Sequence, residues 1–383
     1  MIRACLFGTY NATHPANRLL AEALATAGCE VTACHEPLWE RTRDKMPDYF
    51  GTRSLARLGL AYLGAARRLR AAFRSQPRPD LVVAGFNGQL DVLLARLVAG
   101  RRARLVFAPL VTLTETLVDD RRIYRSGGAK ARLAAYLDRL TLGRADLVLL
   151  DTEAHRAYVA ERVSARAPTA TLYLGAEALF APVPPRRRRS AEPLRVLFYG
   201  QYVPLHGVGI IVEAAALIGP GKGVELTMIG TGPDRAAAEQ RARDRRATHV
   251  RFEDWTPYES LPRRLAQCDV ALGIFGRTPK ARIVIPTKVY QAGAVGRAIV
   301  SGDTAALREV FTPGEDVLAV PLGDPGALAQ ALRRLRDEPE LGPRLGAAAA
   351  RLLAQHLDRR AQGDRMRTVL TQAFPDLAAA RRA

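Results

Sequence analysis

The chain has 383 residues, 48% of them hydrophobic, which is enough for two domains of ordinary size with sizeable cores. A formal net charge of +19 indicates attraction to anionic partners, although a genomic bias toward Arg can account for part of it. The basic residues are scattered and carry no aromatic-basic recognition motif, which argues against nucleic-acid binding, and no apolar run is long enough to span a bilayer.

The first half of the chain alternates strand-like apolar runs with helical patterns. The expected strands cover residues 3–7, 30–34, 80–84, 104–107, 146–150 and 169–172. Helical patterns lie between them, among them residues 17–27, 91–99, 130–142 and 152–163. This alternation predicts an α/β fold with a doubly wound parallel sheet, and strands rich in Val and Leu suit a sheet covered on both faces. Because the chain starts directly with a strand, we expect no signal peptide.

Residues 53–74 have the pattern of a basic amphipathic helix. Apolar residues recur near helical spacing and six arginines flank them; the apolar set is Leu55, Leu58, Tyr62, Leu63, Leu69 and Phe73. Such a helix can lie on an anionic membrane surface, which is the interpretation we favour. The alternative is an ordinary surface helix whose Arg stems cover apolar surface.

A long polar stretch, PLVTLTETLVDDRR (residues 109–122), follows the strand at 104–107 and has no apolar period. Polar loops at the carboxyl ends of strands form binding sites in open α/β sheets. We therefore expect an acceptor substrate to contact Glu115, Asp119 and Arg121, together with Asn87 and Asp91 after the preceding strand. The alternative is a solvated connection.

Residues 181–193, APVPPRRRRSAEP, are typical of a linker, because they contain prolines and four consecutive arginines and have no hydrophobic periodicity. A second α/β series follows, with expected strands at residues 195–199, 225–229, 250–252, 270–274, 298–301 and 317–320. The sequence thus predicts an N-terminal domain over residues 1–180, a C-terminal domain over residues 194–357, and a final helix over residues 358–383 that returns toward the N-terminal domain.

Two glycine turns in the second series are candidates for phosphate binding. In FYGQYVPLHG a strand ends before Gly200 and a helix begins at Gly207, so backbone N–H groups and the helix dipole can face a phosphate. In MIGTGPD a similar turn contains Gly230 and Gly232, a weaker signal on its own. Further along, an expected flexible loop supplies Lys280.

A short helix from Thr287 to Ala292 comes next and places Lys288 and Gln291 on one face. The two lysines, Lys280 and Lys288, offer point charges for a diphosphate, and the alternative for each is an ordinary solvated side chain.

These motifs resemble the nucleotide-sugar site of retaining glycosyltransferases of family 4, which have the GT-B fold of two Rossmann-like domains facing a cleft. The resemblance covers about residues 194–357 and is looser over the first half. It implies that the C-terminal domain binds a nucleoside-diphosphate sugar and that the N-terminal domain binds the acceptor. It further implies transfer with retention, without a metal or another cofactor.

Site residues follow from the resemblance position by position. A basic pair usual in the family is replaced here by Gln201 and His206, and His206 with Lys280 is expected to stabilise the leaving diphosphate. Gln291 takes the place of an acid that binds the ribose, whereas Ile283 stands where a second acid is expected. The remaining donor contacts that the resemblance implies are Trp255 and Thr256 near the base and Gly302 and Asp303 in a later turn.

The version Pro-x-Lys-x-x-Gln in IPTKVYQ resembles a polysaccharide-assembly branch of the family. With the basic helix, it predicts a lipid-linked or polyprenyl-linked glycan acceptor, or a cell-surface glycan, and a cytoplasmic protein on the inner membrane face. Two alternatives stay open: a nucleotide-sugar epimerase, and a nucleotide-sugar-binding protein with weakened catalysis.

Overall fold

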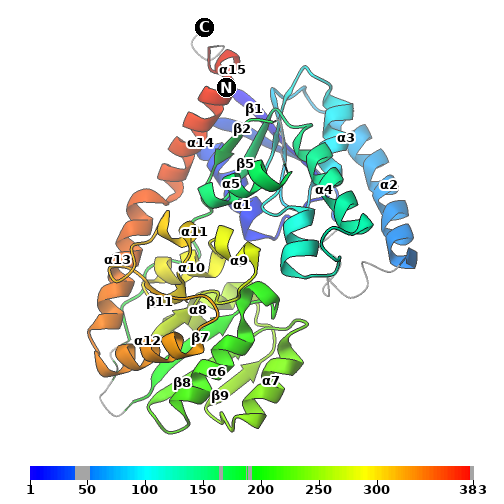
Figure 1. Ribbon diagram of the computed structural model, residues 1–383. Helices are drawn as coiled ribbons and strands as arrows, with labels where there is room; N and C mark the ends of the chain where they lie inside the picture. The colour runs from blue at the N-terminus through cyan, green and yellow to red at the C-terminus, as the bar shows by residue number, and fades with distance from the viewer. Residues whose placement is uncertain (39–51, 164–166, 187, 189–191, 380–383) are drawn as a thin grey trace.

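The computed structural model describes residues 1–38, 52–163, 167–186, 188 and 192–379. In these residues the chain forms two six-stranded sheets in which every strand pair is parallel (Figure 1). The first sheet has the order β2-β1-β3-β4-β5-β6 and the second β12-β11-β10-β7-β8-β9. The fold class expected from the sequence, two doubly wound α/β domains, is therefore confirmed.

The strands lie at the positions that the apolar runs predict. In the first sheet they are β1 (Ile2–Gly8), β2 (Cys29–His35), β3 (Leu81–Ala84), β4 (Arg104–Phe107), β5 (Leu147–Leu150) and β6 (Thr169–Thr171). In the second they are β7 (Leu194–Tyr199), β8 (Val224–Ile229), β9 (Val250–Glu253), β10 (Val270–Leu272), β11 (Ala298–Gly302) and β12 (Leu318–Val320). Central strands such as β3 and β5 are buried along their whole length, as expected for a sheet covered on both faces.

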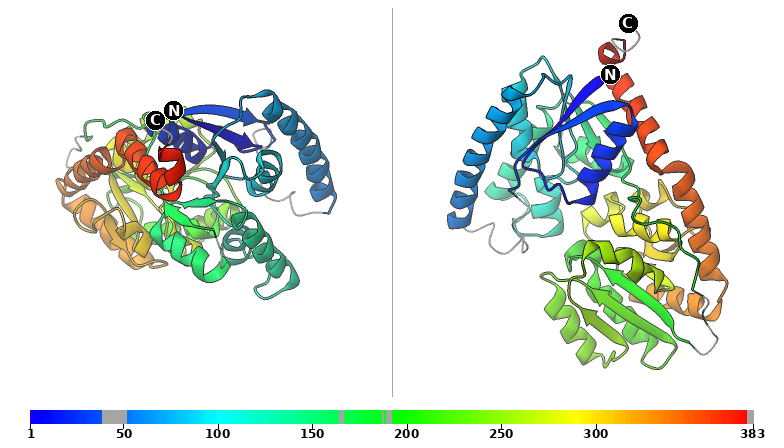
Figure 2. Two further views of the ribbon diagram at one scale, coloured as in Figure 1. Left: turned by 90° about the horizontal axis from the view of Figure 1, so that it is seen from above. Right: turned by 180° about the vertical axis from the view of Figure 1, so that it is seen from behind.

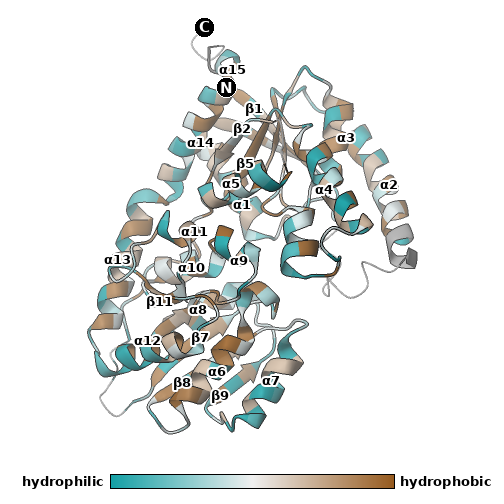
Figure 3. Cartoon of the chain, viewed as in Figure 1, coloured by the Kyte–Doolittle hydropathy of each residue, from teal (hydrophilic) through white to brown (hydrophobic). Residues whose placement is uncertain are grey.

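Helices cover both sheets. Those of the first half are α1 (Pro15–Thr26), α2 (Thr52–Ser75), α3 (Gln89–Ala99), α4 (Ala129–Leu142) and α5 (Glu153–Tyr158). Those of the second half are α6 (Val208–Ile218), α7 (Arg235–Asp244), α8 (Leu261–Ala266), α9 (Pro279–Ile283), α10 (Thr287–Val295), α11 (Ala305–Arg308) and α12 (Pro325–Asp337). Figure 3 shows the expected polarity: the strands are largely hydrophobic, whereas α7 and α12 carry hydrophilic outer surfaces.

Three C-terminal helices follow, α13 (Leu341–His356), α14 (Arg359–Ala373) and α15 (Pro375–Ala379). Helix α13 packs on α10, and α14 runs back along the N-terminal half of the molecule (Figure 2). There Met366 and Leu370 join the core formed by Leu20 and Leu24 of α1. Helix α14 therefore ties the two domains together. The boundaries assigned to the domains and the linker stay a prediction.

The basic helix expected at residues 53–74 is α2, but its apolar stripe is not free. Leu69 and Phe73 are buried in the core, and the Tyr62 hydroxyl donates a hydrogen bond to Asp91 Oδ1 at 3.1 Å. The leucines left exposed are Leu60 and Leu63. The side chain of Leu55 lies outside the described residues. Within the described residues, each helix is too short or too polar to traverse a lipid bilayer.

Two segments expected as loops are helical. The polar stretch after β4 contains a π-helical turn, η1 (Glu115–Asp120), whose side chains are largely buried. The loop expected to carry Lys280 is α9, where Thr278 caps the helix by accepting a hydrogen bond from the Ala281 N–H and Pro279 occupies the first turn. These were wrong predictions for a common reason: short polar segments without an apolar period are stabilised by caps and by tertiary contacts.

Candidate functional site

The Gly200–Gly207 segment forms a compact loop between β7 and α6. Gly200 has a φ of +142° and Gly207 a left-handed φ of +63°. The short 3-10 turn η3 (Pro204–His206) lies between them. A β-carbon on Gly207 would lie 2.6 Å from the Gly276 nitrogen, so only glycine fits there. The loop ends at the N-terminus of α6, where unpaired N–H groups favour an anion.

The second glycine turn braces this loop. The Tyr202 N–H donates to the Thr231 carbonyl at 2.8 Å, and the Asp234 N–H donates to the Tyr202 carbonyl at 3.1 Å. A β-carbon on Gly230 would lie 2.0 Å from the Gly200 carbonyl oxygen, and one on Gly232 would lie 2.6 Å from the Tyr202 nitrogen. The two predicted phosphate turns are thus packed together, with the second supporting the first.

Lys288 of α10 points its ammonium group at this loop. The side chain is 7% exposed, Nζ lies 4.0 Å from the centre of the Phe198 ring, and a β-carbon on Gly200 would lie 2.9 Å from Nζ. Among the described residues, Nζ has no hydrogen-bond partner. Burial holds the pKa of Lys288 well below its usual value. A buried ammonium group without a partner is costly, which marks it as a position for an anionic ligand.

His206 lies beside Lys288 at the end of the loop. Its Nδ1 donates a hydrogen bond to the Gln201 carbonyl, so in the neutral ring Nε2 carries the lone pair. Burial and, after it, the positive charges of Lys288, Arg121 and Lys280 hold the pKa of His206 well below its usual value. The lowered pKa favours the neutral imidazole in the free protein, and a bound anion would favour the protonated form.

Arg121, from the N-terminal domain, reaches the same loop. Its NH2 donates to Gln201 Oε1 at 3.4 Å, and its Nε lies 3.4 Å from Asp120 Oδ2. The expected donor residue Gln201 is thus held by an expected acceptor residue from the other domain. Arg121 places a guanidinium group where the resemblance predicts a basic residue at position 201.

Lys280 also lies near this loop, but its ammonium group has partners. Its Nζ lies 3.3 Å from Glu115 Oε1 and donates to Thr116 Oγ1 at 3.1 Å. The Thr278 hydroxyl, on the same short helix, donates to Asp120 Oδ1 at 3.1 Å. The helix α9 therefore docks on the π-turn η1, and Lys280 is part of the contact between the domains.

A buried charge network lies behind Lys280. From the sequence only its member Glu115 was assigned a role, in acceptor binding; Glu115 is fully buried, and that role stays a prediction. His155 Nε2 donates to Glu115 Oε2 at 2.8 Å and Nδ1 donates to Asp151 Oδ1 at 2.7 Å. Because both nitrogens face carboxylates, His155 is an imidazolium. Burial disfavours its charge, but Glu115 and Asp151 outweigh burial and raise the pKa of His155. The polar strand exit LLDTEAH (residues 149–155) was the available signal.

Gln291 lies in a second polar network. Its Oε1 accepts from the Tyr199 hydroxyl and its Nε2 donates to the Tyr258 hydroxyl, both at 2.8 Å. Tyr258 in turn donates to Glu177, which accepts from Arg18 Nε at 2.6 Å. Both ends of the Gln291 amide are therefore oriented by tyrosines, and its expected contact with a ribose stays a prediction.

The other expected acceptor residues have partners within the N-terminal domain. Asp91 is fully buried and accepts from the Thr9 N–H at 2.7 Å, and burial raises the pKa of its carboxyl to about 6. Asp119 Oδ2 accepts from the Tyr158 hydroxyl at 2.7 Å. Asn87 lies in the turn between β3 and α3 and has a left-handed φ of +70°. Asp91 of α3 and Asp119 of η1 thus hold these helical segments against the rest of the N-terminal domain, and their roles in acceptor binding stay predictions.

The remaining expected donor residues lie around the second sheet. Trp255 is 58% exposed, so its ring is free to stack, and Thr256 beside it is half-buried. Gly302 is the last residue of β11, and its N–H donates a hydrogen bond to the Ile274 carbonyl at 2.8 Å. Asp303 accepts from Arg308 Nε at 2.7 Å. The roles of these four residues in binding the nucleotide stay predictions.

The structure thus gathers His206, Lys288 and Arg121 at one glycine loop, with Lys280 close by. This cluster has the charge and the N–H groups to hold a diphosphate. In the part of the chain that the structure describes, His, Cys, Asp and Glu side chains form no group of three or more that is placed to hold a metal ion.

Comparison with known proteins agrees with this geometry. Residues 12–175 match the family described as "Glycosyl transferase 4-like domain", and residues 193–338 match "Glycosyl transferases group 1". The lipopolysaccharide core biosynthesis glycosyltransferase LpsD of Rhizobium meliloti is 26% identical over 205 residues, which cover 51% of this chain and 53% of that protein. The chain thus spans about half the length of the curated relatives it matches.

Solved structures extend the likeness to nearly the whole chain. Sucrose-phosphate synthase from Thermosynechococcus elongatus has a TM-score of 0.71 and 19% identity, covering 99% of this chain and 100% of that one. HepE of Anabaena, in complex with UDP-glucose, has a TM-score of 0.70 and 14% identity, covering 97% and 100%. At these identities the likeness establishes the fold, and it confirms the GT-B arrangement expected from the sequence.

Proposed function

We infer the function from the premise that the chain belongs to the group 1, family 4 glycosyltransferases of GT-B fold. We propose that it transfers a sugar from a nucleoside-diphosphate sugar to a glycan acceptor. The observation that carries the proposal is Lys288, whose buried amino group faces the Gly200 loop without a hydrogen-bond partner among the described residues. An anionic diphosphate is the ligand that this group, His206 and the α6 N-terminus would jointly stabilise.

The same residues supply the chemistry of the transfer. As the bond between the anomeric carbon and the diphosphate breaks, negative charge grows on the leaving phosphate oxygens. Arg121 stabilises that charge directly, and Lys288 and His206 do so once they are protonated. Lys280 is better placed to hold the π-turn η1 against this site than to contact the phosphate itself, because Glu115 and Thr116 already bind it.

The donor is a nucleoside-diphosphate sugar, and uridine diphosphate is the first candidate. HepE, which shares the fold, is solved in complex with UDP-glucose. Trp255 offers an exposed ring near the glycine turns for stacking of the base. Retention at the anomeric carbon is proposed on the family resemblance.

The acceptor is proposed to be a lipid-linked or cell-surface glycan. Two curated relatives act, by their names, in lipopolysaccharide core and amylovoran biosynthesis. The exposed basic face of α2 supports a peripheral position on an anionic membrane, with Leu60 and Leu63 at the surface among arginines. We propose a cytoplasmic protein at the inner membrane face on the same grounds.

Two other functions are compatible with the donor site. An epimerase would convert the nucleotide sugar in the absence of an acceptor, and a binding protein would leave it unchanged. A single experiment separates the three. The protein is incubated with UDP-sugars, with and without a membrane extract that contains glycolipids, and the nucleotide products are analysed. Release of UDP only with the extract supports transfer, and an isomerised sugar without the extract would replace the proposal by epimerisation. A donor that binds but stays intact both with and without the extract would replace the proposal by a binding function without catalysis.

A further inference from the structure

Three helices of the N-terminal domain, α2, α3 and α4, cover the same face of its sheet. Leu69 of α2, Val92 of α3 and Leu142 of α4 belong to one hydrophobic core together with Phe7 of β1 and Phe107 of β4. Helix α3 contacts both α2 and α4, and Figure 1 shows the three helices on one side of the domain. Their sides that point away from the sheet therefore form one outer surface, which we call the three-helix face.

Large apolar side chains are exposed on all three helices. In each helix the two residues concerned are three or seven positions apart, so they lie on one side of it. The core residues Ala95 of α3 and Leu142 of α4 lie on the other side. More than half of the large exposed apolar side chains in the described part of the chain fall between residues 60 and 136, so they gather on this face rather than scatter over the molecule. The six on the helices are Leu60 and Leu63 in α2, Leu90 and Leu97 in α3, and Leu133 and Tyr136 in α4.

The exposed charges of the three-helix face have one sign. Between residues 57 and 145, all of which the structure describes, every Asp and Glu is buried or half-buried, whereas most Arg and Lys side chains are exposed. On α4, the exposed Lys130, Arg132 and Arg139 flank the apolar pair. A helical surface that combines apolar side chains with cations and exposes no carboxylate is typical of a surface that binds anionic lipid.

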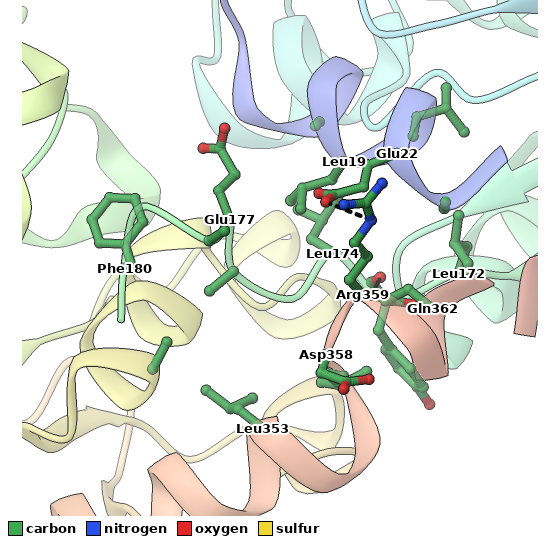
Figure 4. Close-up of a pocket in the computed structure, with 18 of the residues that line it drawn as sticks. Leu19, Glu22, Leu172, Leu174, Glu177, Phe180, Leu353, Asp358, Arg359 and Gln362 are labelled. Atoms are coloured by element: carbon green, nitrogen blue, oxygen red, sulfur yellow. Dashed lines mark hydrogen bonds and ion pairs between the residues drawn. The ribbon is translucent and has the colours of Figure 1, made fainter. Parts of the chain in front are cut away.

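The opposite face of the same sheet is already covered by the chain itself. Leu20 and Leu24 of α1 pack there against Met366 of α14. Figure 4 shows Arg359 of α14 directed toward Glu22 of α1, and Arg359 Nε lies 3.1 Å from Glu22 Oε1. On that face the apolar side chains are buried and opposite charges are paired. On the three-helix face the apolar side chains stay exposed among like charges.

We propose that the three-helix face is a docking surface for an anionic lipid bilayer, on which α2, α3 and α4 lie together with their exposed apolar side chains in the interface. Lipid phosphates attract the cations, and the boundary with the acyl chains removes the leucines from water. A second copy of the chain is a poor occupant, because two such faces repel each other. A nucleic acid would pair with the cations and leave the leucines without a partner. The inference extends the peripheral position proposed above from one helix to three and rests on that position, not on the transfer reaction.

A matched pair of double variants tests the contribution of α3 and α4. Binding of the full chain to vesicles of phosphatidylglycerol and phosphatidylcholine is measured by flotation over a range of lipid concentrations. The face variant combines Leu97→Ser with Leu133→Ser and should bind about tenfold more weakly, because less apolar surface passes from water into lipid. The control variant combines Leu179→Ser with Leu217→Ser, two exposed leucines outside the face, and should bind like the native chain. Neither variant changes the net charge, and thermal unfolding midpoints check that both are folded.

A fluorescent probe tests the position of the face independently of affinity. Tyr136→Trp places an indole on the outer side of α4, and phosphatidylcholine brominated on its acyl chains quenches an indole that enters the lipid. We expect quenching of Tyr136→Trp beyond that of the native chain, which has two tryptophans of its own. Leu217→Trp, in α6 of the C-terminal domain, should show no quenching beyond the native level.

The outcomes decide the proposal in both directions. Weaker binding of the face variant than of the control variant, with quenching at position 136, supports it. Equal binding of the two variants would overturn the three-helix face, and if changing the α2 arginines to Glu still abolished flotation, the contact through α2 alone would stand. A native chain that does not float at low salt would overturn both. So would a dimer that the face variant converts to a monomer, or binding of duplex DNA by a chain that does not float. Binding of uridine diphosphate is measured without vesicles, so failure of this surface and failure of the donor site are distinguishable.

Discussion

Lys280 Nζ lies 3.3 Å from Glu115 Oε1, so the ammonium group of one domain is paired with a carboxylate buried in the other. Glu115 is fully buried and is shared with His155, whereas Lys280 is 8% exposed. Burial opposes the charge of Glu115, but His155 and Lys280 outweigh it and hold the pKa of its carboxyl low. A buried pair of this kind makes the contact between η1 and α9 sensitive to the loss of either partner.

Lys280→Ala is therefore expected to destabilise the protein by about 3–5 kcal/mol, the usual cost of removing one partner of a buried ion pair. The free energy of unfolding in urea measures it, with the exposed Lys222→Ala as control. The double variant Lys280→Met with Glu115→Gln should be less destabilised than the sum of its single changes. Strict additivity of the two changes would show that the pair does not couple the domains.

His155 makes stability depend on pH on the alkaline side. Its folded pKa is raised by Glu115 and Asp151 against the effect of burial. A raised pKa contributes stability that is fully present below the unfolded value of about 6.5 and is lost as pH rises through the folded value. The unfolding free energy of the native chain should thus fall from neutral pH toward pH 10. His155→Gln should flatten this slope, and the exposed His356→Gln should not.

The sequence predicted much of this architecture and less of the site. Apolar runs located the strands of both sheets, because a strand that is buried on both faces appears in the sequence as a continuous run of apolar residues. The Glu115–His155–Asp151 network escaped because Glu115 is 40 residues from His155 in sequence and meets it only when η1 is packed against α5. Lys288 was identified as a candidate from its motif, but that its ammonium group is buried and unpaired is a tertiary property.

Donor binding is expected to take up protons at Lys288 and His206. The free protein holds the pKa of both groups below their usual values, chiefly through burial, and for His206 also through its cationic neighbours. Asp120 and Asp234, near Arg121, are the acidic groups that face this cluster. The negative charge of a bound diphosphate would raise the pKa of Lys288 and of His206 and so favour their protonated forms. The affinity for the diphosphate should therefore rise as pH falls from 8 to 6.

Calorimetry with uridine diphosphate in buffers of different ionisation enthalpy counts the protons taken up. Lys288→Met should weaken binding by about 1.5–3 kcal/mol, the range for a charge-assisted hydrogen bond. His206→Gln should bind more weakly at pH 6 than the native chain and vary less with pH. Lys222→Met serves as the matched control. Binding without proton uptake would contradict the assignment of these two groups.

Gln291 is expected to contact the ribose of the donor. Its amide is oriented by Tyr199 and Tyr258 and retains one N–H and one lone pair for a diol. The native chain should bind a 2′-deoxy nucleotide more weakly than the ribonucleotide. Gln291→Ala should lose this discrimination, and Tyr258→Phe should reduce it, because the amide is then held at one end only. Equal affinities in the native chain would leave Gln291 as a packing residue.

Membrane attachment through α2 is the last prediction, and the structure narrows it to the outer face of the helix. Tyr62, Leu69 and Phe73 are occupied by packing, and Arg68 is paired with Glu36 at 2.9 Å. The groups that remain for lipid are Leu60 and Leu63 with the exposed Arg67, Arg70 and Arg74.

Each basic residue near an anionic surface contributes on the order of 1 kcal/mol, and salt screens the attraction. Flotation with vesicles containing phosphatidylserine should therefore decrease with salt and be lost when Arg67, Arg70 and Arg74 are changed to Glu. In the control variant, Lys222, Arg251 and Arg263 are changed to Glu. These residues are exposed on the C-terminal domain, and the change of net charge is the same. If both triple variants lose flotation equally, the attraction reflects net charge rather than α2. If the native chain fails to float at low salt, α2 is an ordinary surface helix, and the proposal of a lipid-linked acceptor loses its support from the structure.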